Sequence, residues 1–316
     1  DAPPERFVET CRTYQLQARD LALKHPDLDV MIWPESMFMS FFPQYLLDED
    51  ATVPEGWPYD ATKLQSEVGA RQHDFDVHVS STLKAINGRD ENGQPQRNIA
   101  QIVGTATYHF QKDKVGRYNA ALAISPEGQI AGHYYKMHPV MFGEYIPLGE
   151  ALPWIYRFTP MPEGLTRGKA PAEFEVAGYK LAPSICFEST VPHLIRRQIN
   201  TLAARGEAPD VLVNVTNDGW FWGSGILDLH YNCAVFRAVE NHRPMLVAAN
   251  TGFSVAVDGR GQVLSKGPRR APADLVVEVS KDGRHSLYTQ WGDWPLLGFL
   301  SLGAVAGLIL NRRPRT

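Results

Sequence analysis

The chain has 316 residues, of which 44% are hydrophobic and 21% are charged, and this is enough apolar sequence to bury a large core. Its formal net charge of −4 gives no overall attraction to nucleic acid, so we expect no nucleic-acid partner. The three cysteines, Cys11, Cys186 and Cys233, form no C-x-x-C pair. This argues against a zinc ribbon or a disulfide framework, and we expect neither a metal nor a cofactor.

The first half of the chain predicts a helix followed by strands. Residues 5–24 carry apolar side chains at helical spacing, and residues 28–35 form a continuous apolar run that is typical of a buried strand. Residues 37–58 hold many aromatic residues and prolines and predict a loop. Further along, we expect a helix over residues 61–75 and strands over residues 99–110, 118–124 and 130–135.

The second half alternates strands with helices. We expect helices over residues 191–206 and 226–243, and strands over residues 180–187, 211–216, 245–250, 254–264 and 274–280. The pair Asp258-Gly259 marks a hairpin turn within one of these segments. Helices alternating with strands, together with hairpins, indicate an α/β fold in which parallel and antiparallel strand pairing are mixed.

The C-terminal run from Trp294 to Asn311 contains no charged residue. As a helix it would span ~27 Å, close to the hydrocarbon thickness of a bilayer. Arg312 and Arg313 end the run, and the positive-inside rule places them in the cytoplasm. We therefore expect a main domain over residues 1–288 on the outer side of a membrane, a transmembrane helix over 294–311 and a short basic tail over 312–316; a buried C-terminal helix is the alternative.

Polar side chains follow three of the expected strands at the point where each strand ends. Glu35 follows the first apolar run, Cys186 follows Ile185, and Asn217-Asp218 follow the strand over residues 211–216. Sites in open α/β sheets lie at such carboxyl ends. A carboxylate held there in partly apolar surroundings becomes a useful base, and it can activate a neighbouring thiol. Taken alone, Glu35 also fits a helix cap or a surface acid, and Cys186 also fits an inert core thiol.

Lys136 lies in the segment HYYKMHPVMFGEYIPLG, where an expected strand leads into a loop. Glu144 lies eight residues later in the same loop. A lysine in this setting can supply the positive charge that stabilises an oxyanion, although an ordinary solvated lysine is the alternative.

Two aromatic stretches lie directly after candidate site residues. The stretch MFMSFFPQYLL follows Glu35, and WFW follows Asp218-Gly219. Aromatic side chains suit acyl chains and membrane interfaces, and they also suit a protein core. The candidate lipid contacts in these stretches are Phe38, Phe41, Phe42, Trp220 and Trp222.

Taken in this order, the motifs resemble the nitrilase superfamily. The resemblance rests on WPE at 33–35, Y-x-K at 134–136, FGEYIPLG at 142–149, ICFE at 185–188, NVTNDGWF at 214–221, FRAVENHRP at 236–244 and NTGFSVAVDGRGQVL at 250–264. It covers roughly residues 5–280 and is most similar to the apolipoprotein N-acyltransferase branch. It implies an α-β-β-α sandwich as the catalytic domain, followed by the C-terminal transmembrane helix.

The resemblance also implies roles for individual residues. Glu35 is the expected general base, Lys136 the oxyanion stabiliser and Cys186 the nucleophile, with Glu144 and Glu188 in support. Phe187 stands where members of the family often have tyrosine, so a hydroxyl role at this position is lost or moved.

The implied reaction is transfer of a fatty acyl chain from a phospholipid, through a thioester on Cys186, to the N-terminal amine of a diacylglyceryl-cysteine lipoprotein. It would take place on the periplasmic side of a bacterial inner membrane. A membrane-tethered amidase or carbamoylase with the same three residues is the alternative enzyme, and a non-catalytic binding or assembly module is a second alternative.

The N-terminus raises a separate expectation. The first ten residues, DAPPERFVET, have neither the basic nor the apolar region of a signal peptide, so we expect a processed chain or a part of a longer one. Members of the family carry several membrane helices ahead of the catalytic domain. We expect these helices to have been removed or to belong to another polypeptide.

Overall fold

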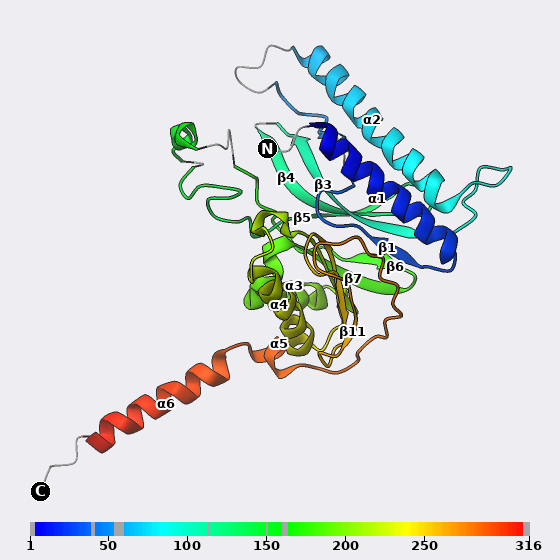
Figure 1. Ribbon diagram of the computed structural model, residues 1–316. Helices are drawn as coiled ribbons and strands as arrows, with labels where there is room; N and C mark the ends of the chain where they lie inside the picture. Colours follow the sequence, from blue (N-terminus) through cyan, green and yellow to red (C-terminus); the bar gives the residue numbers. More distant parts are fainter. Residues whose placement is uncertain are drawn as a thin grey trace, which may run out of the picture.

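The computed structural model describes residues 4–38, 42–53, 60–112, 114–149, 151–159 and 164–311. Two β-sheets pack face to face, and helices cover the outer face of each sheet (Figure 1). The expected four-layered α-β-β-α sandwich is therefore the observed architecture.

The first sheet contains the strands β1 (Val30–Ile32), β2 (Gln44–Leu47), β3 (Ala100–Phe110), β4 (Val115–Ile124) and β5 (Ile130–Tyr135). β1 and β2 both pair with β3 in parallel, one after the other along its length. β3, β4 and β5 form an antiparallel meander. The loop expected over residues 37–58 thus contains the short strand β2, which the many aromatic residues and prolines of that stretch concealed.

The second sheet has the strand order β11-β10-β9-β8-β7-β6. Its strands are β6 (Phe174–Val176), β7 (Tyr179–Ile185), β8 (Val211–Asn217), β9 (Met245–Asn250), β10 (Val255–Val257) and β11 (Val263–Lys266). β7, β8 and β9 are parallel, whereas the outer pairs are antiparallel. The mixed pairing expected from the sequence is confirmed. The carboxyl ends of the three parallel strands meet at one edge, where Cys186 directly follows β7.

Four helices form the outer layers of the sandwich. α1 (Pro4–Lys24) and α2 (Ala61–Asn87) pack on the first sheet, and α3 (Pro192–Ala204) and α4 (Ile226–Asn241) pack on the second. Apolar side chains between the two sheets, including Ile102 and Val213, form a third cluster. Removing a fully buried aliphatic side chain from such a core typically costs about 2–5 kcal/mol.

The helix α2 is longer than the sequence predicted. The expected end was residue 75, but the buried face of the helix continues for three more turns, with Phe75, Val79, Leu83 and Ile86 at helical spacing. The helix begins where the Asp60 side chain accepts a hydrogen bond from the Lys63 N–H, 2.8 Å away.

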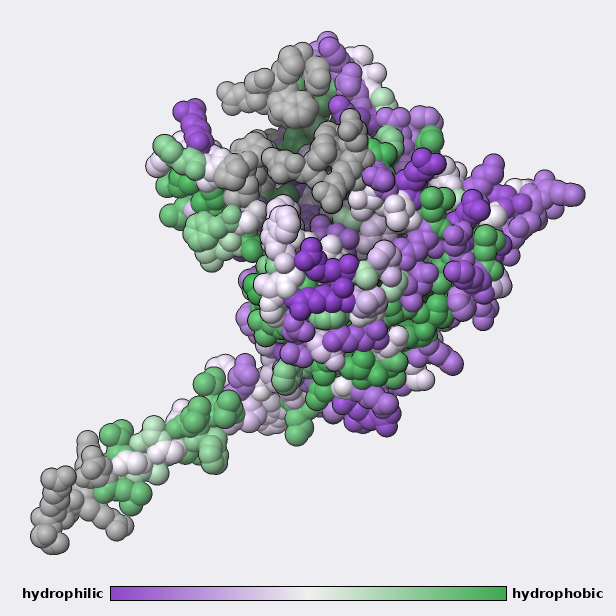
Figure 2. Space-filling view, viewed as in Figure 1, coloured by the Kyte–Doolittle hydropathy of each residue, from purple (hydrophilic) through white to green (hydrophobic). Residues whose placement is uncertain are grey.

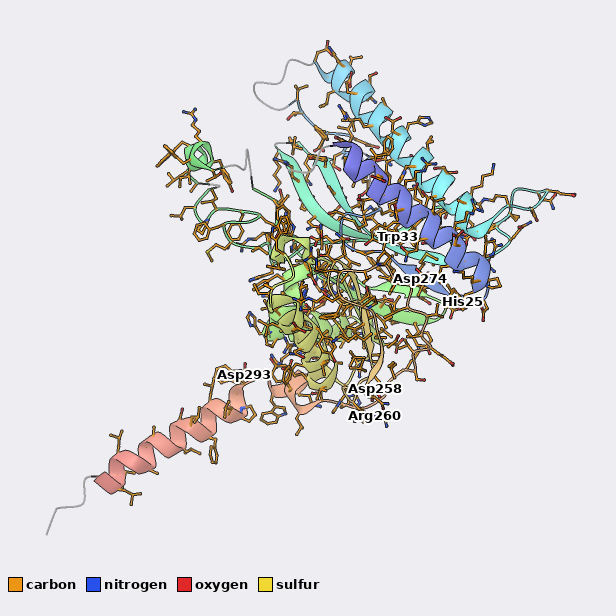
Figure 3. The ribbon with its side chains drawn as sticks, viewed as in Figure 1. His25, Trp33, Asp258, Arg260, Asp274 and Asp293 are labelled. Atoms are coloured by element: carbon orange, nitrogen blue, oxygen red, sulfur yellow. The ribbon has the colours of Figure 1, made fainter. Side chains whose placement is uncertain are left out.

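The strand expected over residues 274–280 is not formed. These residues have no regular secondary structure, although Leu275, Val277 and Val279 are partly buried and alternate with exposed neighbours. The segment lies along the edge of the sandwich, where Asp274 lines a cavity of about 850 Å³ together with His25 and Trp33 (Figure 3). Side-chain packing replaces strand pairing here, so the expected strand is wrong.

The C-terminal helix α6 (Trp294–Asn311) follows the short helix α5 (Leu287–Trp291) and extends away from the sandwich (Figure 1). Its apolar side chains are exposed along its whole described length (Figure 2). The alternative of a buried C-terminal helix is therefore wrong. Among the described residues, no helix combines the length and the hydropathy needed to cross a bilayer, so the expected transmembrane helix is not confirmed.

Candidate active site

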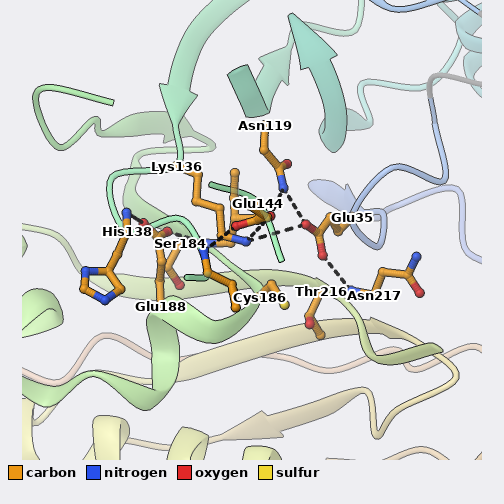
Figure 4. A network of polar contacts seen from close by, with 12 residues as sticks. Glu35, Asn119, Lys136, His138, Glu144, Ser184, Cys186, Glu188, Thr216 and Asn217 are labelled. Carbon is orange, nitrogen blue, oxygen red and sulfur yellow. Dashed lines mark hydrogen bonds and ion pairs between the residues drawn. The ribbon is translucent and has the colours of Figure 1, made fainter. Parts of the chain in front are cut away.

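The three residues expected to act together do converge. Glu35 follows β1, Lys136 follows β5 and Cys186 follows β7, so both sheets contribute to one site (Figure 4). All three side chains are at least nine-tenths buried. The Lys136 Nζ lies 3.9 Å from Glu35 Oε1. Such an enclosed group of a carboxyl, an ammonium and a thiol can move a proton and stabilise a charge without competition from bulk water.

The Glu35 carboxylate is held by one residue from each sheet. Asn119 Nδ2 on β4 donates to Oε1 over 2.5 Å, and the Asn217 N–H at the end of β8 donates to Oε2 over 2.9 Å. Gly104 on β3 allows the Glu35 backbone to approach closely, because a Cβ at position 104 would lie 2.6 Å from Glu35 Cα. The Glu35 carboxylate is therefore held both by the packing of its backbone and by the hydrogen bonds to its two oxygens.

Lys136 is shared between two glutamates. Its Nζ donates to Glu144 Oε1 over 2.7 Å, a shorter contact than the 3.9 Å to Glu35. The second oxygen of Glu144 accepts the Val140 N–H over 2.7 Å. Burial lowers the pKa of Lys136, but Glu35, Cys186 and Glu144 raise it, and the net shift is upward. The lysine therefore remains a cation inside the site.

The same surroundings raise the pKa of Glu35. Burial is the largest cause, and the negative charge of Glu144 adds to it, while Lys136, Asn119 and the Asn217 N–H oppose it. A carboxylate with a raised pKa accepts a proton more readily than an ordinary glutamate does. Glu35 is thus chemically suited to serve as a general base.

Cys186 has an unusual backbone conformation, with φ of 52°. A non-glycine residue in the left-handed region is uncommon, and such strain gathers at functional sites. It lies at the start of the 3₁₀ helix η2 (Cys186–Thr190), and its carbonyl accepts hydrogen bonds from the Asn214 Nδ2 and the Ser189 hydroxyl, each over 3.2 Å. These donors stabilise the sharp turn between β7 and η2, which presents the thiol to Glu35 and Lys136.

The Cys186 side chain is almost entirely in its protonated thiol form in the resting protein. Burial, followed by the negative charge of Glu35, raises the pKa of Cys186 to about 12, although Lys136 lowers it. A thiolate therefore forms efficiently only when a base takes the proton locally, and Glu35 is the carboxylate placed to do so.

Glu188 ties the loop after β5 to the turn after β7. One of its oxygens accepts the N–H groups of Met137 and His138 over 2.7 and 2.9 Å. The other accepts the Tyr134 hydroxyl over 2.7 Å and the Ile185 N–H over 2.8 Å. Because the carboxylate is fully buried and accepts four hydrogen bonds, it fixes Lys136 in relation to Cys186.

Sequence reasoning missed Asn119, which connects the two glutamates. Its Nδ2 donates to Glu144 Oε1 over 3.3 Å as well as to Glu35. Asn119 lies in the middle of β4, directly after Arg117 and Tyr118, which are also polar, so no distinct signal in the sequence identifies it. In the described residues, no group of three or more His, Cys, Asp or Glu side chains could hold a metal ion.

The candidate lipid contacts separate into different environments. Trp220 and Trp222, at the 3₁₀ helix η3 (Asp218–Phe221) that follows β8, are 80% and 84% exposed. Phe42 is also exposed. Phe38 is 1% exposed and packs against Trp33 and His78, so for this lipid-contact candidate the alternative of a core residue holds. Phe41 lies outside the described residues.

A second exposed apolar segment was not among the candidates. The loop after β5 and the 3₁₀ helix η1 (Pro153–Phe158) expose Phe142, Leu148, Trp154 and Phe158. In Figure 2 much of this part of the surface is green. We name residues 141–149 together with 151–158, and residues 220–222, the aromatic segments. Glu144 lies within the first of them, and Asn217 lies just before the second, so both segments are attached directly to the site.

The sequence matches the carbon-nitrogen hydrolase family over residues 9–284. An apolipoprotein N-acyltransferase of Rhodopirellula baltica is 32% identical over 98% of this chain and 57% of the relative. Another from Haemophilus ducreyi is 34% identical over 98% of this chain and 53% of the relative. This chain therefore spans about half the length of the curated relatives that it matches.

Solved structures support the fold alone. A carbon-nitrogen hydrolase from Helicobacter pylori superimposes with a TM-score of 0.54 and 16% identity, covering 84% of this chain and 82% of that one. An amidase from Nesterenkonia sp. gives a TM-score of 0.53 and 17% identity, covering 94% of both chains.

Proposed function

This chain belongs to the carbon–nitrogen hydrolase family, in its apolipoprotein N-acyltransferase branch, and from that premise we propose that it carries the acyl-transfer site of such an enzyme. The donor is a phospholipid, and the acceptor is the N-terminal amine of a diacylated lipoprotein. The observation that supports this most strongly is the enclosed arrangement of Glu35, Lys136 and Cys186 in a chain whose named relatives are N-acyltransferases. We assign residues 1–288 to this catalytic domain.

The first half-reaction forms a thioester. Glu35 accepts the proton of the Cys186 thiol, and the resulting thiolate attacks the carbonyl carbon of the ester. Lys136 stabilises the negative charge that develops on the carbonyl oxygen. When the intermediate collapses, the lysophospholipid leaves as an alkoxide and takes the proton from Glu35, and the acyl group remains on Cys186.

The second half-reaction transfers the acyl group to nitrogen. The lipoprotein amine attacks the thioester carbonyl, and Glu35 accepts a proton from that nitrogen. Collapse of this intermediate forms the amide and expels the Cys186 thiolate, which regains its proton from Glu35. The buried carboxylate thus alternates between base and acid, a role that its raised pKa favours.

We also propose that the domain works against a membrane. The support is the exposed apolar surface of α6 and of the aromatic segments, which a soluble small-molecule enzyme does not need. Trp220 and Trp222 suit the interface between headgroups and acyl chains. As the resemblance implies, we place the site on the outer side of a bacterial inner membrane, with α6 in contact with the bilayer and residues 312–316 on the cytoplasmic side.

The test is the intact mass of the detergent-solubilised protein after mixing with phospholipid, compared with Cys186→Ala. We expect a gain of one fatty-acyl mass that hydroxylamine removes and that the mutant lacks. Adding a diacylated lipopeptide should then discharge the thioester and yield a triacylated peptide. Turnover of small amides with no acyl mass gain would instead indicate the membrane-tethered amidase.

A further inference from the structure

A second polar group lies behind Cys186, on the side away from Lys136. Thr216, near the end of β8, is fully buried. Figure 4 shows its side chain beside Cys186, on the strand below the thiol. The Thr216 hydroxyl donates to Asp218 Oδ1 over 2.8 Å. A hydroxyl has only one proton, so Thr216 can donate to the carboxylate or to the sulfur, but not to both.

Asp218 is held by a buried histidine. The Asp218 Oδ1 lies 2.9 Å from His230 Nδ1 on α4. Because an ionised carboxylate only accepts, we assign the ring proton to Nδ1. The His230 Nε2 then lies 2.8 Å from the Ser189 hydroxyl and 3.2 Å from the Cys186 carbonyl oxygen, and the single Ser189 proton goes either to this nitrogen or to that carbonyl. Asp218, His230 and Ser189 are all more than nine-tenths buried, so this chain of hydrogen bonds has no access to bulk water.

Asp218 thus accepts hydrogen bonds from two donors, Thr216 and His230, and the Thr216 hydroxyl has two possible acceptors, Asp218 and the Cys186 sulfur. When the Cys186 sulfur is a neutral thiol, the Thr216 proton goes to the Asp218 carboxylate. If the sulfur becomes negative, it attracts that proton more strongly than the Asp218 carboxylate does. Asp218 then still accepts the hydrogen bond from the N–H of His230. The hydroxyl needs only to rotate about its C–O bond, and no covalent bond breaks.

We propose that Thr216 is a further catalytic residue, whose hydroxyl turns from Asp218 to Cys186 Sγ whenever the sulfur carries negative charge. The inference rests on Cys186 being the nucleophile of the proposed function. Thr216 stabilises the thiolate that attacks the ester and the thiolate that leaves when the amine takes the acyl group. Asp218 and His230 are positioning residues, because His230 holds the Asp218 carboxylate where it can accept the hydroxyl proton when the sulfur is neutral.

The sign of the electrostatics agrees with this role. The hydrogen bond from Thr216 lowers the pKa of Cys186, whereas the negative charge of Asp218 raises it. The charged groups that face the thiol are Glu35 after β1, Lys136 after β5 and Asp218 after β8. Lys136 acts on the thiol from one side only, and Thr216 supplies a neutral donor on the other.

The test is the pH dependence of Cys186 alkylation by iodoacetamide, because this reaction needs the thiolate and no acyl substrate. Peptide mass spectrometry separates Cys186 from Cys11 and Cys233. Thr216→Val keeps the shape and removes the hydroxyl, and Thr216→Ser keeps the hydroxyl. We expect Thr216→Val to slow alkylation about tenfold at each pH below the thiol pKa, and Thr216→Ser to react like the natural protein.

Two results would overturn the inference. Equal alkylation of Thr216→Val and the natural protein would show that the hydroxyl does not hold the thiolate. An equal loss in Thr216→Val and Thr216→Ser would assign the effect to packing. Thermal unfolding of both variants identifies any loss of folded protein. If alkylation shifts as expected but no variant forms an acyl thioester, the proposed function fails while the role of Thr216 stands.

Discussion

The buried site around Cys186 and the exposed aromatic segments differ in how the fold holds their side chains. Glu35, Lys136 and Glu188 are each fixed by hydrogen bonds or ion pairs from at least two elements. Trp220 and Trp222 are exposed and depend on one 3₁₀ helix for their positions. We infer that the interior sets which bond is made and broken, whereas the aromatic segments decide which molecules reach it. Changes in the two regions should therefore fail in different ways.

The largest effect is expected for Lys136→Ala. The change removes the cation beside the developing oxyanion and leaves Glu35 and Glu144 without the ammonium that separates them. Thioester formation should fall by about a thousandfold or more with short-chain and long-chain esters alike. The measurement is the rate of acyl mass gain on Cys186. Lys169→Ala, at an exposed lysine, is the control and should lose nothing; a Lys136→Ala rate within tenfold of normal would contradict the assigned role.

A smaller but still general loss is expected for Glu188→Gln. An amide can accept on its oxygen only, so two of the four donors around this buried group lose their acceptor. We expect acylation to fall about a hundredfold with both ester lengths and the free energy of unfolding to fall by about 1–3 kcal/mol. Thermal unfolding and acylation rates measure the two effects. Glu175→Gln, at an exposed position on β6, should change neither.

The pH dependence of acylation should identify Glu35 as the base. Only the ionised carboxylate accepts the thiol proton, so the rate falls as the pH drops through the pKa of Glu35. Because burial raises that pKa, the midpoint of the acid limb should lie above 4.5, the ordinary value of a glutamate. A short-chain ester in detergent gives the profile without any effect of lipid packing. Glu35→Gln should remove this limb together with most of the rate, and an unchanged profile would assign the limb to another group.

The smallest and most selective effect is expected for Trp222→Ala. Removing an exposed indole leaves the interior intact, so acylation by a short-chain ester should remain within twofold, while acylation by a long-chain phospholipid should fall about three- to tenfold. Trp291→Ala, at an exposed tryptophan of α5, is the matched control and should affect neither donor. Equal losses on the two donors would mean that Trp222 supports the site rather than contacts lipid.

The sequence could predict most of the layers and part of the site. Long apolar runs give strands, and a polar residue at the end of such a run lies at a sheet edge, which is why Glu35, Cys186 and Asn217 were found. Asn119 could not be found in this way, because it lies within a strand and faces the site only through the pairing of β4 with its neighbours. Local patterns do not encode such sheet geometry.

Two other differences have the same cause. Phe38 was a candidate lipid contact because aromatic residues in a loop suit lipid, but in the fold α2 packs over it and makes it part of the core. Residues 274–280 alternate like a strand, yet the structure describes no ladder partner for them. In both cases the outcome depends on a distant element that a short window of sequence does not contain.

The hydrogen bonds of Glu188 and Glu35 have a consequence for how the protein folds. They connect residues that are 51 and 182 positions apart in the chain and that belong to different sheets. Contacts of such long sequence separation form late, because the chain must first close large loops. Each sheet can gain its own strands without creating a working site. The reactivity of the Cys186 thiol during refolding should therefore change only when the two sheets dock, which makes this side chain a natural reporter of the last step of folding.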